Sequence, residues 1–242
     1  MKTITIGDIH GKNVWKQIDP NKYDKIIFVG DYVDDYPPTT DNQIIQNLFD
    51  IVAFKRDNPD KVVLLYGNHD LQYLNPRLRC SGYRPSMALI LGVFFNDNRE
   101  LFQHSFQIKK HIWTHGGITY GWFKNILLPT MNAMEHRGIK LSGDLATILN
   151  MLADTSYASK SLYACGYMRD GLDPWSGPLW ADKTEFGIIG KNLPDDYHQI
   201  VGHSKVPGIK NTYNFANPRC NSSIQFVDCL DTTTEFYEVE IT

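Results

Sequence analysis

Five short segments of the chain carry carboxylate, amide or imidazole side chains beside a glycine. In chain order they are Gly7-Asp8-Ile9-His10-Gly11, Gly30-Asp31-Tyr32-Val33-Asp34, Gly67-Asn68-His69-Asp70, His115-Gly116-Gly117 and Gly202-His203-Ser204. Oxygen and imidazole donors of this kind bind divalent cations. Two neighbouring cations activate water and neutralise the charge that develops when a phosphate ester is cleaved. The pattern therefore predicts a binuclear metal site for phosphoester hydrolysis.

Each segment follows a run of strand-forming residues, so its polar side chains are expected at a strand end. The runs are residues 3–6, 25–29, 62–66, 112–114 and 199–201. Asp8 and His10 are two residues apart, so on an extended strand end they point to the same side and can bind one metal. A carboxylate at Asp31 can bridge two cations through its two oxygens. Asn68 offers a neutral oxygen ligand, and His69 beside it points elsewhere, toward a leaving group.

Two of the eight histidines, His115 and His203, complete the expected ligand set. Each follows a strand-forming run and lies next to glycine. Four further histidines have no such setting, and we expect them to be structural: His104, His111, His136 and His198.

The ordered set of segments resembles the calcineurin-like metallophosphoesterase superfamily. Within it, the segments are most similar to those of the phosphoprotein phosphatases and their bacterial and phage relatives. The resemblance implies a hydroxide between two metals that attacks phosphorus in line. The implied ligands are Asp8, His10 and Asp31 for the first metal, and Asp31, Asn68, His115 and His203 for the second.

The resemblance also assigns roles to His69 and Asp34. His69 becomes the general acid that protonates the leaving alkoxide, and Asp34 orients its imidazole. An imidazole held by a carboxylate has the pKa range and the fixed tautomer that this proton transfer needs. Histidine, aspartate and asparagine ligands suit manganese, iron or zinc, and we favour manganese for the two divalent cations.

The phosphate-binding side of the predicted site departs from the family pattern. Where phosphoprotein phosphatases usually have two phosphate-binding arginines, this chain has Asp35 and Tyr66. Residues 177–182 resemble a family segment that lines the substrate groove, and a loop rich in arginine and tyrosine follows the third motif. We expect cationic residues from these two places to bind the substrate: Arg77, Arg79, Arg84 and Lys183.

The substrate class stays open. We expect a phosphomonoester on a protein or a nucleotide. A phosphodiesterase, or a hydrolase of dinucleoside polyphosphates or nucleic-acid ends, is the alternative. The net charge of −3 gives little support to a nucleic-acid partner, which usually requires a basic surface. A catalytically inactive scaffold of the same fold is a further alternative, which the filled ligand positions disfavour.

The length of 242 residues predicts a single α/β domain over residues 1–242. The resemblance implies two mixed β-sheets packed as a sandwich and flanked by helices. A helical cap-like insertion is expected around residues 122–190, because this block lies between the fourth and fifth motifs. Residues 41–52 carry apolar side chains at helical spacing, and Asp41 is the expected cap. A second helix is expected over residues 87–95. Further strands are expected at residues 199–201, 224–227 and 236–241.

The sequence shows no sign of export or membrane insertion. We find no signal-peptide pattern and no apolar run of about 18 residues. No Cys-x-x-Cys pair occurs, and we interpret the four cysteines as reduced thiols, although a Cys220–Cys229 bridge stays open. These features predict a cytoplasmic protein with no membrane partner.

Overall fold

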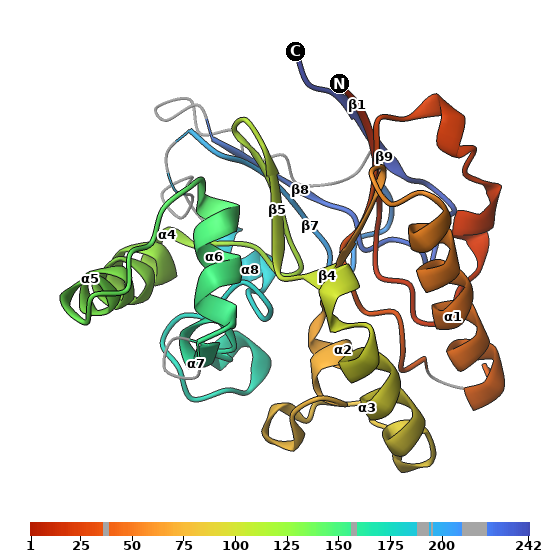
Figure 1. Cartoon of the computed structure of the whole chain (residues 1–242), viewed down its shortest axis with the longest axis horizontal. Helices are drawn as coiled ribbons and strands as arrows, with labels where there is room; N and C mark the ends of the chain where they lie inside the picture. The colour runs from red at the N-terminus through yellow and green to blue at the C-terminus, as the bar shows by residue number, and fades with distance from the viewer. Residues whose placement is uncertain (36–38, 156–158, 188–193, 195, 210–221) are drawn as a thin grey trace.

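The computed structural model contains two β-sheets flanked by helices (Figure 1). It describes residues 1–35, 39–155, 159–187, 194, 196–209 and 222–242. The first sheet has the order β4-β3-β2-β1-β9 and the second has the order β5-β6-β7-β8. The strands are β1 (Lys2–Ile6), β2 (Lys25–Phe28), β3 (Val62–Leu65), β4 (Phe102–Gln103), β5 (Ser105–Ile108), β6 (His111–Thr114), β7 (His198–Val201), β8 (Ser223–Phe226) and β9 (Tyr237–Glu240).

Both sheets are mixed, because each joins one antiparallel pair to a set of parallel strands. The antiparallel pairs are β1 with β9 and β5 with β6. In the first sheet, Ile6 is the register partner of Phe28, and Phe28 is the partner of Leu64. In the second sheet, Thr114 is the partner of Val201. The parallel strands therefore end side by side, and the polar segments that follow them meet at the same end of the sandwich.

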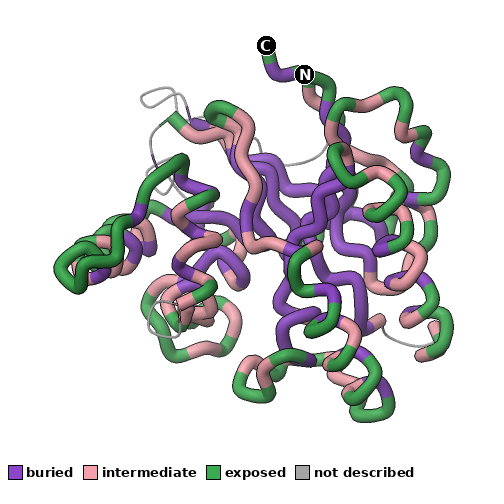
Figure 2. Tube along the Cα trace, viewed as in Figure 1, coloured by how far each residue is buried: buried purple, intermediate pink, exposed green. Residues whose placement is uncertain are grey.

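The inner faces of the two sheets pack directly against each other. Apolar side chains from both sheets and their flanking residues form one buried cluster: Ile27, Val29, Val63, Leu65, Trp113, Ile200, Val227 and Ile241. Figure 2 shows that buried chain runs through the centre of both sheets. The indole N–H of Trp113 donates to the Thr5 hydroxyl at 2.9 Å and so links the sheets. The predicted sandwich of two mixed sheets is confirmed.

Two helices, α1 (Asp41–Asp57) and α3 (Ala88–Asp97), contribute to a second buried cluster together with the first sheet. The predicted apolar stripe of α1 is buried, but the cap predicted at Asp41 is wrong. Asp41 is the first helical residue, whereas Thr40 has the extended backbone of a cap and its hydroxyl accepts the Gln43 N–H at 3.3 Å. Short turns complete this half: α2 (Asn68–Leu71) and 3₁₀ turns at Val14–Gln17, Pro20–Lys22, Pro76–Leu78, Pro85–Met87 and Arg99–Leu101.

Helices that lie between β6 and β7 in the sequence form a separate group, on the left in Figure 1. They are α4 (Tyr120–Trp122), a π-helix (Phe123–Leu127), α5 (Leu128–His136), α6 (Leu145–Ala153), α7 (Ser159–Leu162), a 3₁₀ turn (Tyr167–Arg169) and α8 (Lys183–Gly187). α6 docks on the second sheet through Asn150, whose amide donates to the Ser105 carbonyl and accepts from His104 N–H, both at 2.9 Å. That the group acts as a cap stays a prediction.

Candidate metal centre

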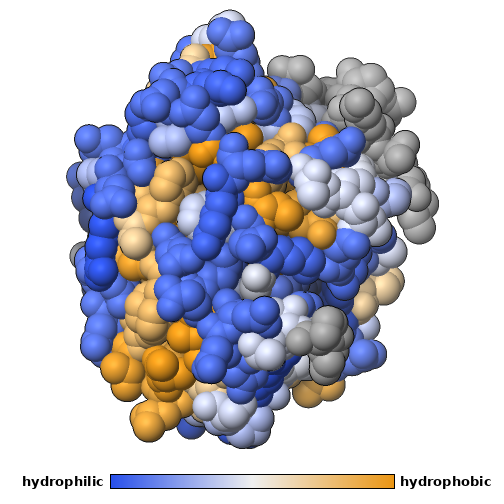
Figure 3. Space-filling model, turned by 90° about the vertical axis from the view of Figure 1, so that its right-hand side faces the viewer, coloured by the Kyte–Doolittle hydropathy of each residue, from blue (hydrophilic) through white to orange (hydrophobic). Residues whose placement is uncertain are grey.

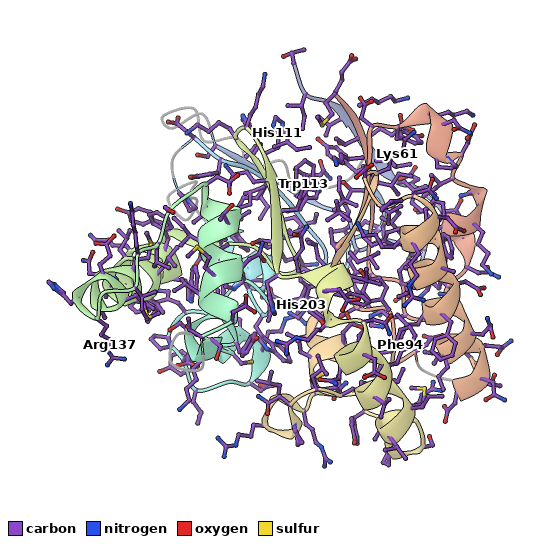
Figure 4. All side chains as sticks on the ribbon, in the orientation of Figure 1. Lys61, Phe94, His111, Trp113, Arg137 and His203 are labelled. Carbon is purple, nitrogen blue, oxygen red and sulfur yellow. The ribbon has the colours of Figure 1, made fainter. Side chains whose placement is uncertain are left out.

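The five polar segments converge on one cleft of about 740 Å³ at the ends of the parallel strands. Seven of the eight predicted metal-site and proton-transfer residues line it: Asp8, His10, Asp31, Asp34, Asn68, His69 and His203. The eighth, His115, is fully buried behind them. Figure 4 shows His203 between the two halves of the molecule, whereas His111 lies toward the opposite end of the second sheet. The structure thus brings together residues that lie far apart in the sequence.

Four of these residues have a left-handed backbone, which is uncommon for residues other than glycine. Their φ angles are 41° at His10, 51° at Asp31, 63° at Asp34 and 61° at His203. Such conformations cost roughly 1–3 kcal/mol each and cluster at functional sites, where the surrounding structure holds them. Each turn takes the chain sharply away from a strand end and leaves the side chain at the cleft.

Two glycines allow the carboxylates to lie unusually close to the backbone. A Cβ atom at Gly67 would collide with the Asp31 carboxylate, and a Cβ atom at Gly202 would collide with Asp8. Only glycine therefore fits at these two strand ends without displacing a predicted ligand.

The donor atoms fall into two groups that share Asp31. The first group is His10, Asp31 and His69, and the second is Asp31, His115 and His203. Within each group the ligand atoms lie within 4.8 Å of one another. A carboxylate common to two compact donor groups is what a pair of cations about 3.5–4 Å apart requires. The residues therefore fit a binuclear centre, although the first group also brings His69 within reach of a metal.

Backbone carbonyls orient two of the predicted histidine ligands. The Nδ1 atom of His10 lies 2.9 Å from the Val33 carbonyl, and that of His115 lies 2.8 Å from the Val29 carbonyl. These contacts leave Nε2 of both rings directed at the centre, as is usual for metal-binding histidines. The Nε2 atom of His203 is buried and has no hydrogen-bond partner among the described residues. A buried imidazole nitrogen without a partner suits a metal ligand.

Asp8 and Asn68 each lie beside a histidine of the second donor group. Both oxygens of Asp8 accept the His203 backbone N–H at 3.0 Å. The side-chain oxygen of Asn68 lies 2.9 Å from Nε2 of His115. Each of the two residues is thus fixed beside a member of the second donor group, although the two compact groups themselves do not include Asp8.

Buried charges of both signs surround Asp31. Burial would raise the pKa of Asp31, but the imidazoles of His115 and His69 outweigh it and hold that pKa well below its usual range. Burial lowers and Asp31 raises the pKa of His115, with a net rise to about 9. Burial and the carboxylates of Asp228 and Asp31 raise the pKa of Asp8 well above its usual value. Divalent cations would relieve this crowding of carboxylates.

The Asp34 carboxylate lies 3.3 Å from Nδ1 of His69. It is almost fully buried and also accepts from the Gln72 amide and the Tyr73 hydroxyl. Burial alone would lower the pKa of His69, but Asp31 and Asp34 outweigh it and raise that pKa well above its usual value. Asp34 is therefore placed to orient the His69 ring beside the cleft. Sequence reasoning had not identified Gln72 and Tyr73, which hold Asp34.

The three arginines expected to bind substrate are not among the described residues that line the cleft. Arg84 pairs with Asp41 at 2.7 Å, and Arg79 lies over the Tyr83 ring at 4.5 Å from its centroid. Arg77 is exposed at a 3₁₀ turn. Lys183 does line the cleft, and its Nζ atom donates to the Lys205 carbonyl at 2.8 Å.

Tyr66 also lies away from the cleft. Its ring stacks on Phe102 with centroids 5.0 Å apart, and it packs near Phe95 and His104. An arginine at this position would point into the helix-covered side of the sheet in this chain. Asp35, by contrast, lines the cleft.

Three cationic residues line the cleft without having been predicted from the sequence, namely Lys12, Lys205 and Arg169, and Arg169 is the arginine among them. Its Nη2 atom lies 2.8 Å from the Asp182 carboxylate, 3.2 Å from the His203 carbonyl and 3.3 Å from the Ser204 hydroxyl. Its Nε atom is buried without a partner in the described part of the chain. Its sequence signal is weak, namely its place shortly before residues 177–182, which resemble a substrate-groove segment.

The fold and the site define the class of protein. The family model of the calcineurin-like phosphoesterases matches residues 1–227, and the chain belongs to that family. It is therefore a phosphoesterase, as the resemblance predicted. No curated protein shows a significant match. No helix among the described residues is long and apolar enough to cross a membrane.

The solved structures similar to this chain include two of cold-active protein tyrosine phosphatases. One shares 19% identity at a TM-score of 0.60, covering 99% of this chain and 73% of the other. The second, from a psychrophilic Shewanella species, shares 19% identity at a TM-score of 0.56 and covers 99% and 75%. At this identity the likeness establishes the fold, and the substrate has to be inferred from the cleft.

Proposed function

We propose that the protein hydrolyses phosphomonoesters with two divalent cations, manganese being favoured. The observation that carries the proposal is Asp31, which belongs to both compact donor groups. Asp8 and His10 would complete the first metal site with Asp31. The second site would add the remaining ligands to Asp31: Asn68, His115 and His203. When bound, the cations would supply an acidified water and neutralise charge on the phosphate.

His69 would donate the proton that the leaving alkoxide needs. The Asp34 carboxylate favours the protonated imidazole and fixes the ring so that the second nitrogen faces the cleft. Gln72 and Tyr73 hold Asp34 in turn, so the orientation of His69 rests on three buried contacts. This role competes with direct metal binding by His69, because the same ring lies in the first donor group.

Arg169 would bind the phosphate oxygens, with Lys183 nearby. A guanidinium group is well suited to a phosphomonoester dianion because its planar N–H groups can form two parallel bonds. The contacts with His203, Ser204 and Asp182 place Arg169 beside a proposed ligand of the second site, where its partly exposed side chain lines the cleft. The phosphate-binding role predicted for the arginine loop passes to Arg169 in this proposal.

The substrate we favour is a phosphorylated protein, consistent with the names of the similar structures. A phosphodiester is the second candidate, because Asp35 and Asp182 line the cleft and would repel a dianion. A cytoplasmic location stays a prediction.

A pair of model substrates tests the proposal. Manganese-loaded enzyme should cleave para-nitrophenyl phosphate faster than bis-para-nitrophenyl phosphate, and two metal ions should be retained per chain. Faster cleavage of the bis ester would favour the diesterase. No cleavage of either compound with two bound metals would point to the inactive scaffold.

A further inference from the structure

Two surface grooves continue from the catalytic cleft across helix α1. We call the first the amide groove, because asparagine and glutamine side chains line it. It has a volume of about 1130 Å³ and begins at Lys12, which also lines the cleft. It passes into a third hollow of about 720 Å³ between α1 and α3, which we call the apolar groove. The amide and apolar grooves share Asn42, Ile45 and Ile90. The cleft and the two grooves are therefore neighbours on the surface, and an extended ligand that leaves the cleft past Lys12 would meet them in this order.

The amide groove presents groups that match a polypeptide backbone. Its walls carry the carboxamides of Asn13, Asn42, Gln43, Gln46 and Asn47. Asn13 and Asn42 are exposed, so their amides can both donate to and accept from peptide groups, whereas Asn47 is buried and bonded to Trp15 and Lys12. Peptide N–H and C=O groups need such partners wherever water is displaced.

The apolar groove is formed by side chains that the core does not use. α3 is apolar on nearly all sides, yet only Leu91 and Phe95 within it are buried. On its outer side Leu89 is 82% exposed and Val93 is 53% exposed. In Figure 3 the hydrophobic side chains gather at the lower left of the face that α1 occupies. Gathered exposed aliphatic side chains, unlike isolated ones, mark interaction sites.

Two phenylalanines form the base of the apolar groove. The rings of Phe49 on α1 and Phe94 on α3 stack with centroids 4.4 Å apart, and both line the groove. Figure 4 shows Phe94 on α3 on the side toward α1. The stacked rings hold the two helices together, so the groove exists before any ligand binds. Asp97 stands on its rim and favours a basic residue beside an apolar anchor.

We propose that the amide and apolar grooves dock a polypeptide substrate whose phosphorylated residue enters the cleft. An apolar residue some distance along the same chain would occupy the apolar groove. This inference rests on the proposed phosphatase function and assigns the substrate class as phosphoprotein. A nucleic acid fits poorly, because the apolar groove presents exposed aliphatic side chains and the carboxylate of Asp97, which would repel its phosphates.

Synthetic phosphopeptides test the docking. Each carries one phosphotyrosine or phosphoserine, a Gly-Ser spacer of about four to ten residues, and a Leu-Ile-Ala-Lys anchor placed on either side. Each residue of extended spacer adds about 3.3–3.6 Å of reach. The control peptide replaces leucine and isoleucine by alanine. We expect the anchored peptide to have a KM about tenfold lower at one spacer length, with little change in kcat.

Substitutions in the apolar groove should remove that advantage. Leu89→Asp and Val93→Asp should raise the KM of the anchored peptide to that of the alanine peptide. Both should leave hydrolysis of para-nitrophenyl phosphate unchanged, which also shows that the variants fold. Ile139→Asp is the matched control, because Ile139 is an exposed aliphatic residue outside both grooves, 40% exposed.

The outcomes separate the docking from the catalysis. If para-nitrophenyl phosphate is cleaved but the anchor has no effect at any spacer length, the docking inference is wrong and the phosphatase stands. If no substrate is cleaved, fluorescence polarisation of labelled peptides tests the docking without catalysis. Tighter binding of the anchored peptide than of the alanine peptide supports docking in the grooves, and equal binding contradicts it. If sedimentation shows a dimer that Leu89→Asp converts to a monomer, a second copy occupies the groove and the docking inference is wrong.

Discussion

The proposed metal ligands follow the ends of paired strands, whereas Arg169 and Lys183, which line the same cleft, come from a 3₁₀ turn and from the first residue of α8. Ile6, Phe28 and Leu64 are aligned by the sheet register, so the position of each proposed ligand depends on a few residues of local backbone. Arg169 and Lys183 reach the cleft from the segment between β6 and β7. Strand ends can be predicted from an apolar run and a glycine, but the position of a loop depends on packing far away in the sequence.

Two arginines illustrate the difference. Arg84 follows the third motif closely, yet it lies against Asp41 and helps to fix the loop to α1. Arg169 lies about a hundred residues beyond that motif, yet it contacts the carbonyl of His203. Closeness in sequence to His69 was therefore a poor guide to closeness in space.

The largest expected effect comes from breaking the shared ligand. Asp31→Asn removes the charge common to both donor groups, and we expect loss of at least one metal and nearly all turnover. Plasma mass spectrometry of the purified variant measures the metals, and hydrolysis of para-nitrophenyl phosphate measures turnover. Two retained metals with a near-normal rate would rule out a bridging role.

The next effect concerns His69, which belongs to one donor group and also pairs with Asp34. His69→Asn should keep both metals and lose roughly 10²–10⁴ in rate on a substrate with a poor leaving group. Nitrophenolate needs no proton, so its ester should suffer much less. Asp34→Asn should show a milder form of the same dependence. Loss of a metal from His69→Asn, with equal losses on both substrates, would make His69 a ligand.

A smaller effect distinguishes the two arginines. Arg169→Ala should lower kcat/KM for a phosphomonoester at least tenfold, about 1.4 kcal/mol of transition-state stabilisation. Arg169→Lys should recover only part of it, because a lysine cannot form the bidentate contact. Arg84→Ala should leave kcat/KM within about twofold. The reverse pattern would return the phosphate-binding role to the arginine loop.

The smallest expected effect concerns Asp70, which holds the backbone around the predicted ligands. Asp70 accepts the backbone N–H groups of Asp31 and Tyr32 at 2.9 Å and that of Gly67 at 2.8 Å. Asp70→Asn replaces one acceptor oxygen by an N–H₂ donor, so at least one of these backbone N–H groups loses its partner. The change should lower the unfolding free energy by about 1–3 kcal/mol. Manganese affinity should also fall, by roughly tenfold.

Urea unfolding and calorimetric titration with manganese measure the two effects of Asp70→Asn. Asp57→Asn, at the exposed end of α1, is the control and should stay within about 0.5 kcal/mol of the wild type. An Asp70→Asn variant that matches this control in both measurements would show that the hydrogen bonds of Asp70 do not support the proposed ligands.

Much of the fold could be predicted because its determinants are local. The apolar runs ending near Ile6, Phe28 and Leu65 are strands, and the apolar stripe of α1 is buried as predicted. The cap of α1 was misplaced by one residue, because Thr40 and Asp41 are both good caps by type and only the backbone distinguishes them.

The rest of the site could not be predicted because it depends on tertiary packing. Whether residue 66 faces the cleft is decided by Phe95 and Phe102, which are distant in sequence. Arg169 enters the cleft through contacts with Asp182 and Ser204 that no spacing indicates. The Cys220–Cys229 bridge that the sequence left open cannot be compared with the structure, because Cys220 lies outside the described residues.

The most direct test of the account is anomalous diffraction from crystals grown with manganese. We predict two anomalous peaks about 3.5–4 Å apart, both within bonding distance of Asp31, with His10 beside one and His115 and His203 beside the other. A single peak, or two peaks that do not share Asp31, would contradict the binuclear centre.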